Sequence, residues 1–173
     1  QDNKHYYKRS PPPTSIKIKQ KSMEKYLRTI QKLIPKKIYT FFQPGYHFLL
    51  AVAGVAIYRK PSRKIHVIGV TGTKGKSSTS EFINAVLVAS GKKTALLSTI
   101  RLKIGNESNP NRYKMTMPGR FVIQKFLHDA VKAKCEYAVI EMTSEGARFY
   151  RHLGIELDAL IFTNLSPEHI ESH

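Results

Sequence analysis

The stretch VIGVTGTKGKSSTSEF, Val67 to Phe82, places a glycine-rich turn between an apolar run and a segment of helical character. Gly72 and Gly75 allow the backbone to curl so that successive N–H groups point toward one place. The helix expected to begin near Lys76 adds the partial positive charge of its N-terminus there. The stretch therefore predicts an anion site, and the anion expected is the phosphate chain of ATP.

The candidate nucleotide ligands all lie in this loop. Lys76 is expected to bring a mobile ammonium to the terminal phosphates, and the Ser77 hydroxyl is placed to ligate an accompanying Mg²⁺. The strict pattern G-x-x-x-x-G-K-[ST] is not met, because Val70 stands where its first glycine is required. The full set of candidates is Gly72, Thr73, Gly75, Lys76, Ser77 and Ser78.

Beyond Pro61, short apolar runs alternate with segments of helical length. The predicted strands are 65–70, 94–98, 137–141 and 158–162, and the predicted helices are 76–90 and 120–134. This alternation predicts an α/β fold, in which a parallel sheet is flanked by helices and carries a P-loop. Ligands of such sheets bind beyond the carboxyl ends of the strands, which is where the glycine-rich turn lies.

The positive charge of the chain is concentrated near its start. The formal net charge is +17, and residues 1–64 hold 15 lysines and arginines against two acidic residues. Residues 1–21 are polar, basic and proline-rich, so we expect a disordered tail. Residues 22–64 are expected to form a basic helical segment, whose first helix begins after Ser22 and ends at Pro35.

Within that segment, residues 38–58 carry no lysine, arginine, aspartate or glutamate and are bounded by basic residues on both sides. The uninterrupted apolar run, 48–58, is shorter than the roughly 20 residues that a spanning helix needs. Three alternatives stay open: a membrane span, an interfacial or hairpin-like contact with an anionic membrane, and a helix packed on the protein itself.

Other classes of protein fit the sequence less well. The single cysteine, Cys135, excludes an internal disulfide framework and a cysteine-rich metal site. The sequence HIESH, residues 169–173, has Ile170 where a zinc protease needs a glutamate. A membrane or nucleic-acid binding module is a distant alternative, drawn from the basic residues 1–64. Polybasic residues beside an apolar helix favour lipid head groups over bases, so we expect no specific nucleic-acid partner.

Further motifs follow the predicted strands in a fixed order. EMTSEGARFYR spans residues 141–151, FTNLSPEHIESH spans 162–173, and TMP spans 116–118. Together with GVTGTKGKSS, residues 69–78, these motifs resemble the Mur ligase superfamily, whose members use ATP to join amino acids to carboxylates. The resemblance runs from about Ile65 to the end and is nearest to the branch of UDP-N-acetylmuramoyl-tripeptide synthetases.

The resemblance implies a role for individual residues. Glu141 matches the glutamate that binds Mg²⁺, His169 matches the histidine that binds a second metal, and Ser77 completes the implied metal ligands. Lys76, Glu141 and His169 are the implied catalytic residues. Thr116, Thr143 and Arg151 are implied to grip the acceptor substrate, and an arginine suits a carboxylate because its planar group donates two hydrogen bonds.

Simpler interpretations of the same residues also stay open. Glu141 at a strand end can pair with a nearby lysine, and His169 can be an ordinary residue at a helix start. Thr143 can act as a helix N-cap, and Arg151 can form a surface salt bridge.

The implied reaction passes the γ-phosphoryl group of ATP to a carboxylate, and the amine of an amino acid then displaces the phosphate to form an amide. The resemblance implies ATP and Mg²⁺ as cofactors, with a peptidoglycan precursor and an amino acid as substrates of a cytoplasmic monomer. The alternative acceptors are a lipid-linked cell-wall precursor or a folate or polyglutamate chain, and residues 22–64 would then meet the inner face of the membrane. Residues 65–173 match the first part of the family's central domain, so we expect a fragment that is inactive alone.

Overall fold

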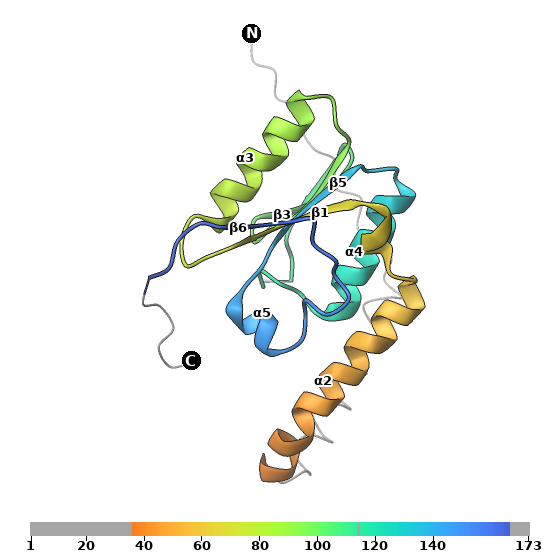
Figure 1. Cartoon of the computed structure of the whole chain (residues 1–173), viewed down its shortest axis with the longest axis vertical. Coiled ribbons are helices and arrows are strands. Elements are labelled where there is room, and N and C mark those ends of the chain that lie inside the picture. Colours follow the sequence, from red (N-terminus) through yellow and green to blue (C-terminus); the bar gives the residue numbers. More distant parts are fainter. Residues whose placement is uncertain (1–35, 114, 167–173) are drawn as a thin grey trace. The chain divides into compact units, whose positions relative to one another are not determined.

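The computed structural model describes residues 36–113 and 115–166 (Figure 1). By its contacts the chain divides into two units, Gln1–Gln43 and Pro44–His173, and the description below concerns the second. The tail expected over 1–21, the helix expected between Ser22 and Pro35, and His169 with the rest of the HIESH sequence lie outside the described residues.

A six-stranded sheet forms the centre of the second unit, with strand order β4-β3-β2-β5-β1-β6. Four strands are parallel neighbours, β2, β5, β1 and β6, and the hairpin of β3 and β4 is joined to β2 in antiparallel register. The bounds are β1 His66–Thr71, β2 Thr94–Leu97, β3 Arg101–Ile104, β4 Glu107–Pro110, β5 Tyr137–Glu141 and β6 Ala159–Phe162. The predicted α/β fold with a parallel sheet is confirmed. The β3–β4 hairpin was not predicted, because its strands are short and largely polar.

Helices lie on both sides of this sheet (Figure 1). Helix α3, on the side opposite α4 and α5, begins one residue after the glycine-rich turn. The predicted helices 76–90 and 120–134 agree with α3 and α4 to within two residues. The bounds are α2 Lys36–Tyr58, the short 3-10 helix η1 Pro61–Lys64, α3 Lys76–Ala89, α4 Arg120–Lys132 and α5 Ser144–Arg148.

The two faces of the sheet bury separate apolar clusters, because successive strand side chains point to opposite faces. In β2, Ala95 and Leu97 belong to the larger cluster, which includes Ile123 and Leu127 of α4. Leu96 of the same strand belongs to the smaller cluster, with Ile83 and Leu87 of α3 packed against it. The two clusters hold α4 and α3 against opposite faces of the sheet. The packing of α3 positions its first turn next to the end of β1.

The apolar stretch 38–58 forms a single helix, α2, which continues through Pro44 and Gly45. Its second half packs on the protein by one side: Ala51 is 1% exposed, and Gly54 lies beside Phe121 and Gln124 of α4. The described residues include no helix with the length and apolar character needed to cross a bilayer. The buried side of α2 agrees with the alternative of a helix packed on the protein.

Truncating the middle of the sheet should lower stability strongly. Ile140 lies in β5 between two parallel neighbours and is 0% exposed. We expect Ile140→Ala to lower the free energy of unfolding by about 2–4 kcal/mol, because it leaves a cavity in close-packed surroundings. Urea unfolding followed by circular dichroism measures the change. Val86→Ala, at a side chain that is 67% exposed, should change it by less than about 0.5 kcal/mol. Equal losses from both variants would contradict this account of the core.

Candidate functional site

The turn between β1 and α3 presents an open helix N-terminus. Gly72 has φ 130° and Gly75 has φ 80°, backbone conformations that residues other than glycine rarely adopt. Gly75 is the N-cap of α3, and no side chain caps this end of the helix. The first turn is closed by the Thr79 N–H, which donates to the Gly75 carbonyl at 2.9 Å. The N–H groups of residues 76–78 therefore have no acceptor within the helix, which is the arrangement that favours an anion.

The turn is held by residues that follow β6, the edge strand next to β1. The Thr73 N–H donates to the Asn164 carbonyl at 3.1 Å, and the Lys74 N–H donates to Asn164 Oδ1 at 2.9 Å. Thr163 Oγ1 donates to the Lys74 carbonyl at 2.7 Å. A Cβ atom on Gly72 would stand 2.2 Å from Thr163 Oγ1. These contacts fix the shape of the turn, and none of them uses the N–H groups in the first turn of α3.

Lys76 lies over the same turn. Its Nζ donates to the carbonyl of Gly72 at 2.6 Å and to that of Thr73 at 2.9 Å. Neither acceptor is a carboxylate, so these bonds place the ammonium without neutralising it. Its positive charge adds to that of the helix N-terminus.

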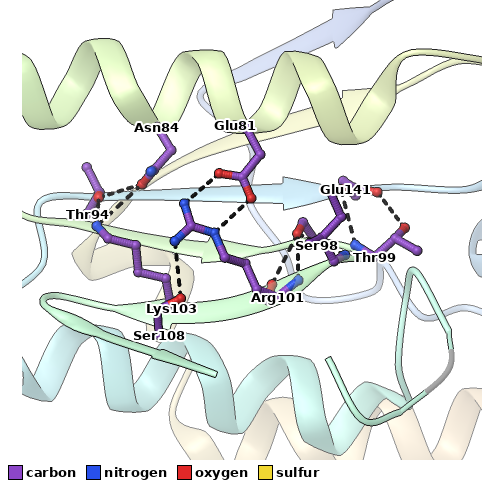
Figure 2. A network of polar contacts seen from close by, with 10 residues as sticks. Glu81, Asn84, Thr94, Ser98, Thr99, Arg101, Lys103, Ser108 and Glu141 are labelled. Carbon is purple, nitrogen blue, oxygen red and sulfur yellow. Dashed lines mark hydrogen bonds and ion pairs between the residues drawn. The ribbon is translucent and has the colours of Figure 1, made fainter. Parts of the chain in front are cut away.

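A buried carboxylate lies next to the start of α3. Glu141, the last residue of β5, is 0% exposed. Its Oε2 accepts from Ser77 Oγ at 3.1 Å and from Thr99 Oγ1 at 2.7 Å, and its Oε1 accepts from the Thr99 N–H at 3.1 Å. Figure 2 shows Thr99, which follows β2, turned toward Glu141. A buried carboxylate requires such donors, because an unpaired polar group in the interior is costly.

The donor set of this cluster fits a hard divalent cation. Mg²⁺ prefers oxygen ligands and is held by one or two carboxylates with waters and phosphate oxygens. Glu141 and Ser77 supply a carboxylate and a hydroxyl beside the open helix end. Among the residues that the structure describes, no group of three or more His, Cys, Asp and Glu side chains is placed to hold a metal by itself. His169 lies outside those residues, so its implied second metal stays a prediction.

The three residues implied to contact the acceptor each have a defined hydrogen-bond partner. Thr116 belongs directly to the cluster around Glu141, because Thr99 Oγ1 lies 2.9 Å from Thr116 Oγ1. Arg151 Nη1 donates to the carbonyl of the neighbouring residue Met117 at 2.6 Å. Thr143 caps α5, and its Oγ1 accepts from the Gly146 N–H at 3.0 Å. The capping role that the sequence allowed for Thr143 is thus present, and acceptor contacts of all three residues stay predictions.

Three residues near the site were not among the sequence candidates. Thr99 joins Glu141 to Thr116, and Asn164 holds the turn. Arg120 is 8% exposed, and its Nη2 donates to the Phe149 carbonyl. Burial lowers the pKa of Arg120, and the charge of Arg151 lowers it further. The signal for Thr99 was its position directly after a predicted strand, but its partner follows from the strand order, which the sequence does not reveal.

A second polar network fastens α3 to the β3–β4 hairpin (Figure 2). Arg101 Nε and Nη2 donate to Oε1 and Oε2 of Glu81 at 2.8 and 2.6 Å, and the hydrogen bond raises the pKa of Arg101. Lys103 Nζ donates to Thr94 Oγ1 at 2.7 Å, and burial followed by repulsion from Arg101 lowers the pKa of Lys103. The hairpin therefore braces α3, whose first turn carries the N–H groups that have no acceptor within the helix.

Removing the hydroxyl that supports the buried carboxylate should destabilise the protein. Thr99→Val keeps the backbone donor to Glu141 and loses the side-chain donor. We expect the free energy of unfolding to fall by about 1–3 kcal/mol, because Glu141 then lacks one of its buried donors. Thr99→Ser keeps a hydroxyl and should recover most of this loss. Urea titration of both variants at neutral pH measures it, and equal stability of the valine variant and the parent would contradict the bond.

A side chain at position 72 should destabilise the protein. Gly72→Ala places a methyl group at φ 130° and against Thr163, so we expect a loss of more than about 2 kcal/mol in the free energy of unfolding. Gly45 of α2 has open space around its Cβ direction. Gly45→Ala is the matched control and should keep or raise stability, since alanine favours helix. Thermal unfolding of the two variants tests the difference in sign. A Gly72→Ala variant as stable as the parent would contradict the close contact between Gly72 and Thr163.

Comparisons of the sequence and the structure with known proteins all point to one family. A family profile described as Mur ligase middle domain matches residues 70–173. The chain is 37% identical over 132 residues to a UDP-N-acetylmuramyl-tripeptide synthetase of Roseiflexus sp. (strain RS-1), covering 75% of this chain and 26% of that protein. A protein of the same name from Treponema pallidum (strain Nichols) is also 37% identical over 132 residues, covering 75% and 24%.

A solved structure has the same fold. It is described as UDP-N-acetylmuramoyl-L-alanyl-D-glutamate--2,6-diaminopimelate ligase, with a TM-score of 0.55 and 26% identity, over 61% of this chain and 21% of that chain. A protein of that name from Geobacillus kaustophilus (strain HTA426) is 33% identical over 124 residues, which are 72% of this chain and 25% of the relative. The chain thus spans about a quarter of the length of the curated relatives that it matches.

Proposed function

The chain belongs to the Mur ligase family through its middle domain, and we propose from this premise that it binds ATP for an amide-forming ligase. The whole enzyme would add an amino acid to a peptidoglycan precursor in the cytoplasm. The relatives bear the names of synthetases and ligases that act on UDP-muramyl peptides. The observation that carries the proposal is the uncapped start of α3, with the Lys76 ammonium beside it and the buried Glu141 next to it.

The phosphate end of the nucleotide would lie at this helix start. The N–H groups of residues 76–78 have no acceptor within the helix and can donate to phosphate oxygens. Lys76 can turn from the carbonyls of Gly72 and Thr73 to a phosphate, because it is bound there only to neutral oxygens. A charged acceptor gives shorter and stronger hydrogen bonds, so the exchange is favourable.

Ser77 and Glu141 would hold Mg²⁺ beside the phosphates. When bound, the ion offsets the negative charge of the phosphate oxygens during phosphoryl transfer. The two side chains are already joined by the 3.1 Å hydrogen bond. Thr99 also holds the carboxylate of Glu141 in place, through its hydroxyl and its backbone N–H.

The acceptor carboxylate would approach past Thr116 and Arg151. Such a ligase passes the γ-phosphoryl group to that carboxylate, and the amine of the incoming amino acid then replaces phosphate at the carbonyl carbon and releases a proton. The chain's own part is to position groups and neutralise charge, which is what phosphoryl transfer mainly requires. Arg151 and Arg120 add positive charge next to residues 116–118, in keeping with an anionic acceptor.

Loss of the ammonium at Lys76 should weaken nucleotide binding. We expect Lys76→Ala to raise the Kd for ATP in the presence of Mg²⁺ at least about tenfold, because one charge-assisted contact to phosphate is removed. Calorimetric titration of the chain with ATP measures this Kd. Lys93→Ala removes an exposed lysine outside the turn and should leave the Kd within about twofold of the parent.

The metal ligand is tested separately in the same titration. Glu141→Gln keeps the shape of the side chain and removes its charge, so the gain in ATP affinity on adding Mg²⁺ should become smaller. Equal ATP affinity of the parent and the Lys76→Ala variant would overturn the proposed nucleotide site. An unchanged response to Mg²⁺ in the glutamine variant would overturn the metal role alone.

A further inference from the structure

The second half of α2 is apolar both on its buried inner face and on its exposed outer face. Its inner face includes Ala51 and Gly54 and packs on α4. Its outer face is exposed and follows the helical spacing of three and four residues: Gly45, Leu49, Val52 and Ala56, bordered by Tyr46 and Ile57. Leu49 is 67% exposed and Ile57 is 65% exposed. A surface helix usually carries polar side chains on its outer face. The exposed apolar face of α2 therefore indicates a contact with a second apolar surface.

Basic residues gather at the end of this face. Arg59 and Lys60 follow α2 directly, at φ 56° and 50°, and Lys64 lies at the end of η1. A cavity of about 370 Å³ opens here and is lined by Tyr58, Arg59, Lys64, His128 and Lys132, with Ile57, Pro61 and Val131 as its apolar part. Within residues 36–113 and 115–166, no carboxylate forms an ion pair with Arg59, Lys60, Lys64 or Lys132.

We propose that the outer face of α2 rests in the head-group region of an anionic lipid bilayer, with the cavity at its end taking a lipid phosphate. An apolar helix face with cations at its edge is the arrangement that binds such an interface. Ile57 belongs both to the outer face and to the cavity lining, so the apolar and the cationic parts are continuous.

The charge of the chain selects this occupant over a second copy of the chain. With a net charge of +17, two copies meeting through the outer face would repel each other, whereas an anionic surface attracts each copy. The inference concerns a surface composed of α2, η1 and the end of α4. It is independent of the proposed ATP site, and its test needs no nucleotide.

The test uses tryptophan fluorescence, because the chain has no tryptophan of its own. Leu49→Trp puts a single reporter on the outer face. Phe82→Trp, at a side chain of α3 that is 73% exposed, is the matched control. On adding vesicles of phosphatidylcholine with phosphatidylglycerol, the emission of Leu49→Trp should move to shorter wavelength and be quenched by brominated lipid. The emission of Phe82→Trp should stay unchanged.

Charge reversal tests the cavity in the chain of residues 1–173. Lys64→Glu should reduce the fraction that floats with these vesicles at least about fivefold, because each basic residue near an anionic surface contributes on the order of 1 kcal/mol. Arg112→Glu makes the same change in net charge at an exposed residue that does not line the cavity and should reduce it less than about twofold.

Several results would overturn the proposal. One is a Leu49→Trp spectrum that does not respond to the vesicles, even if the protein floats with them, since other basic residues would then hold it. Another is an equal response of Phe82→Trp. A blue shift without lipid that grows with protein concentration would assign the face to a second copy instead. Equal flotation of Lys64→Glu and Arg112→Glu would overturn the role of the cavity.

Discussion

The burial of one carboxylate determines how this site is assembled. Glu141 is fully enclosed at the end of β5, and it is acceptable there because Ser77 and Thr99 donate to it from two other elements. An unpaired buried carboxylate would cost more free energy than most single contacts return. The start of α3, the end of β2 and the end of β5 are therefore held in one arrangement. Thr116 joins through Thr99, which brings the loop before α4 to the same edge of the sheet.

The glycine-rich turn obtains its shape from residues about 90 positions later in the chain. Asn164 accepts from the backbone of Thr73 and Lys74, and Thr163 fills the space beside Gly72 where a side chain would otherwise be. The turn is thereby formed in advance of any ligand, and the cost of ordering it does not fall on binding. The open helix end that remains carries partial positive charge, to which Lys76 adds a full one.

The opposite sides of α2 explain why its sequence supported three interpretations. Its inner face is buried at Ala51 and Gly54, and Gly54 lies beside Phe121 and Gln124 of α4. Its outer face is also apolar, and a hydropathy pattern averages the two. The structure separates them: the inner face is core, and the outer face is a surface with a cationic end at Arg59 and Lys64.

The sequence by itself determined most of the regular elements. Apolar runs of strand length, separated by helical spacing, predicted the four parallel strands and the helices α3 and α4, and glycines with a lysine predicted the anion site, because these are local patterns. The family resemblance implied Ser77 and Glu141 as metal ligands, and the hydrogen bond between them came from the structure. The β3–β4 hairpin was missed, since its polar strands are stabilised by pairing and by the Arg101–Glu81 contact. Thr99 and Asn164 acquire their roles from the strand order β2-β5-β1-β6, which places distant chain ends side by side. Only the tertiary structure decides such neighbours, because they depend on the packing of the whole sheet.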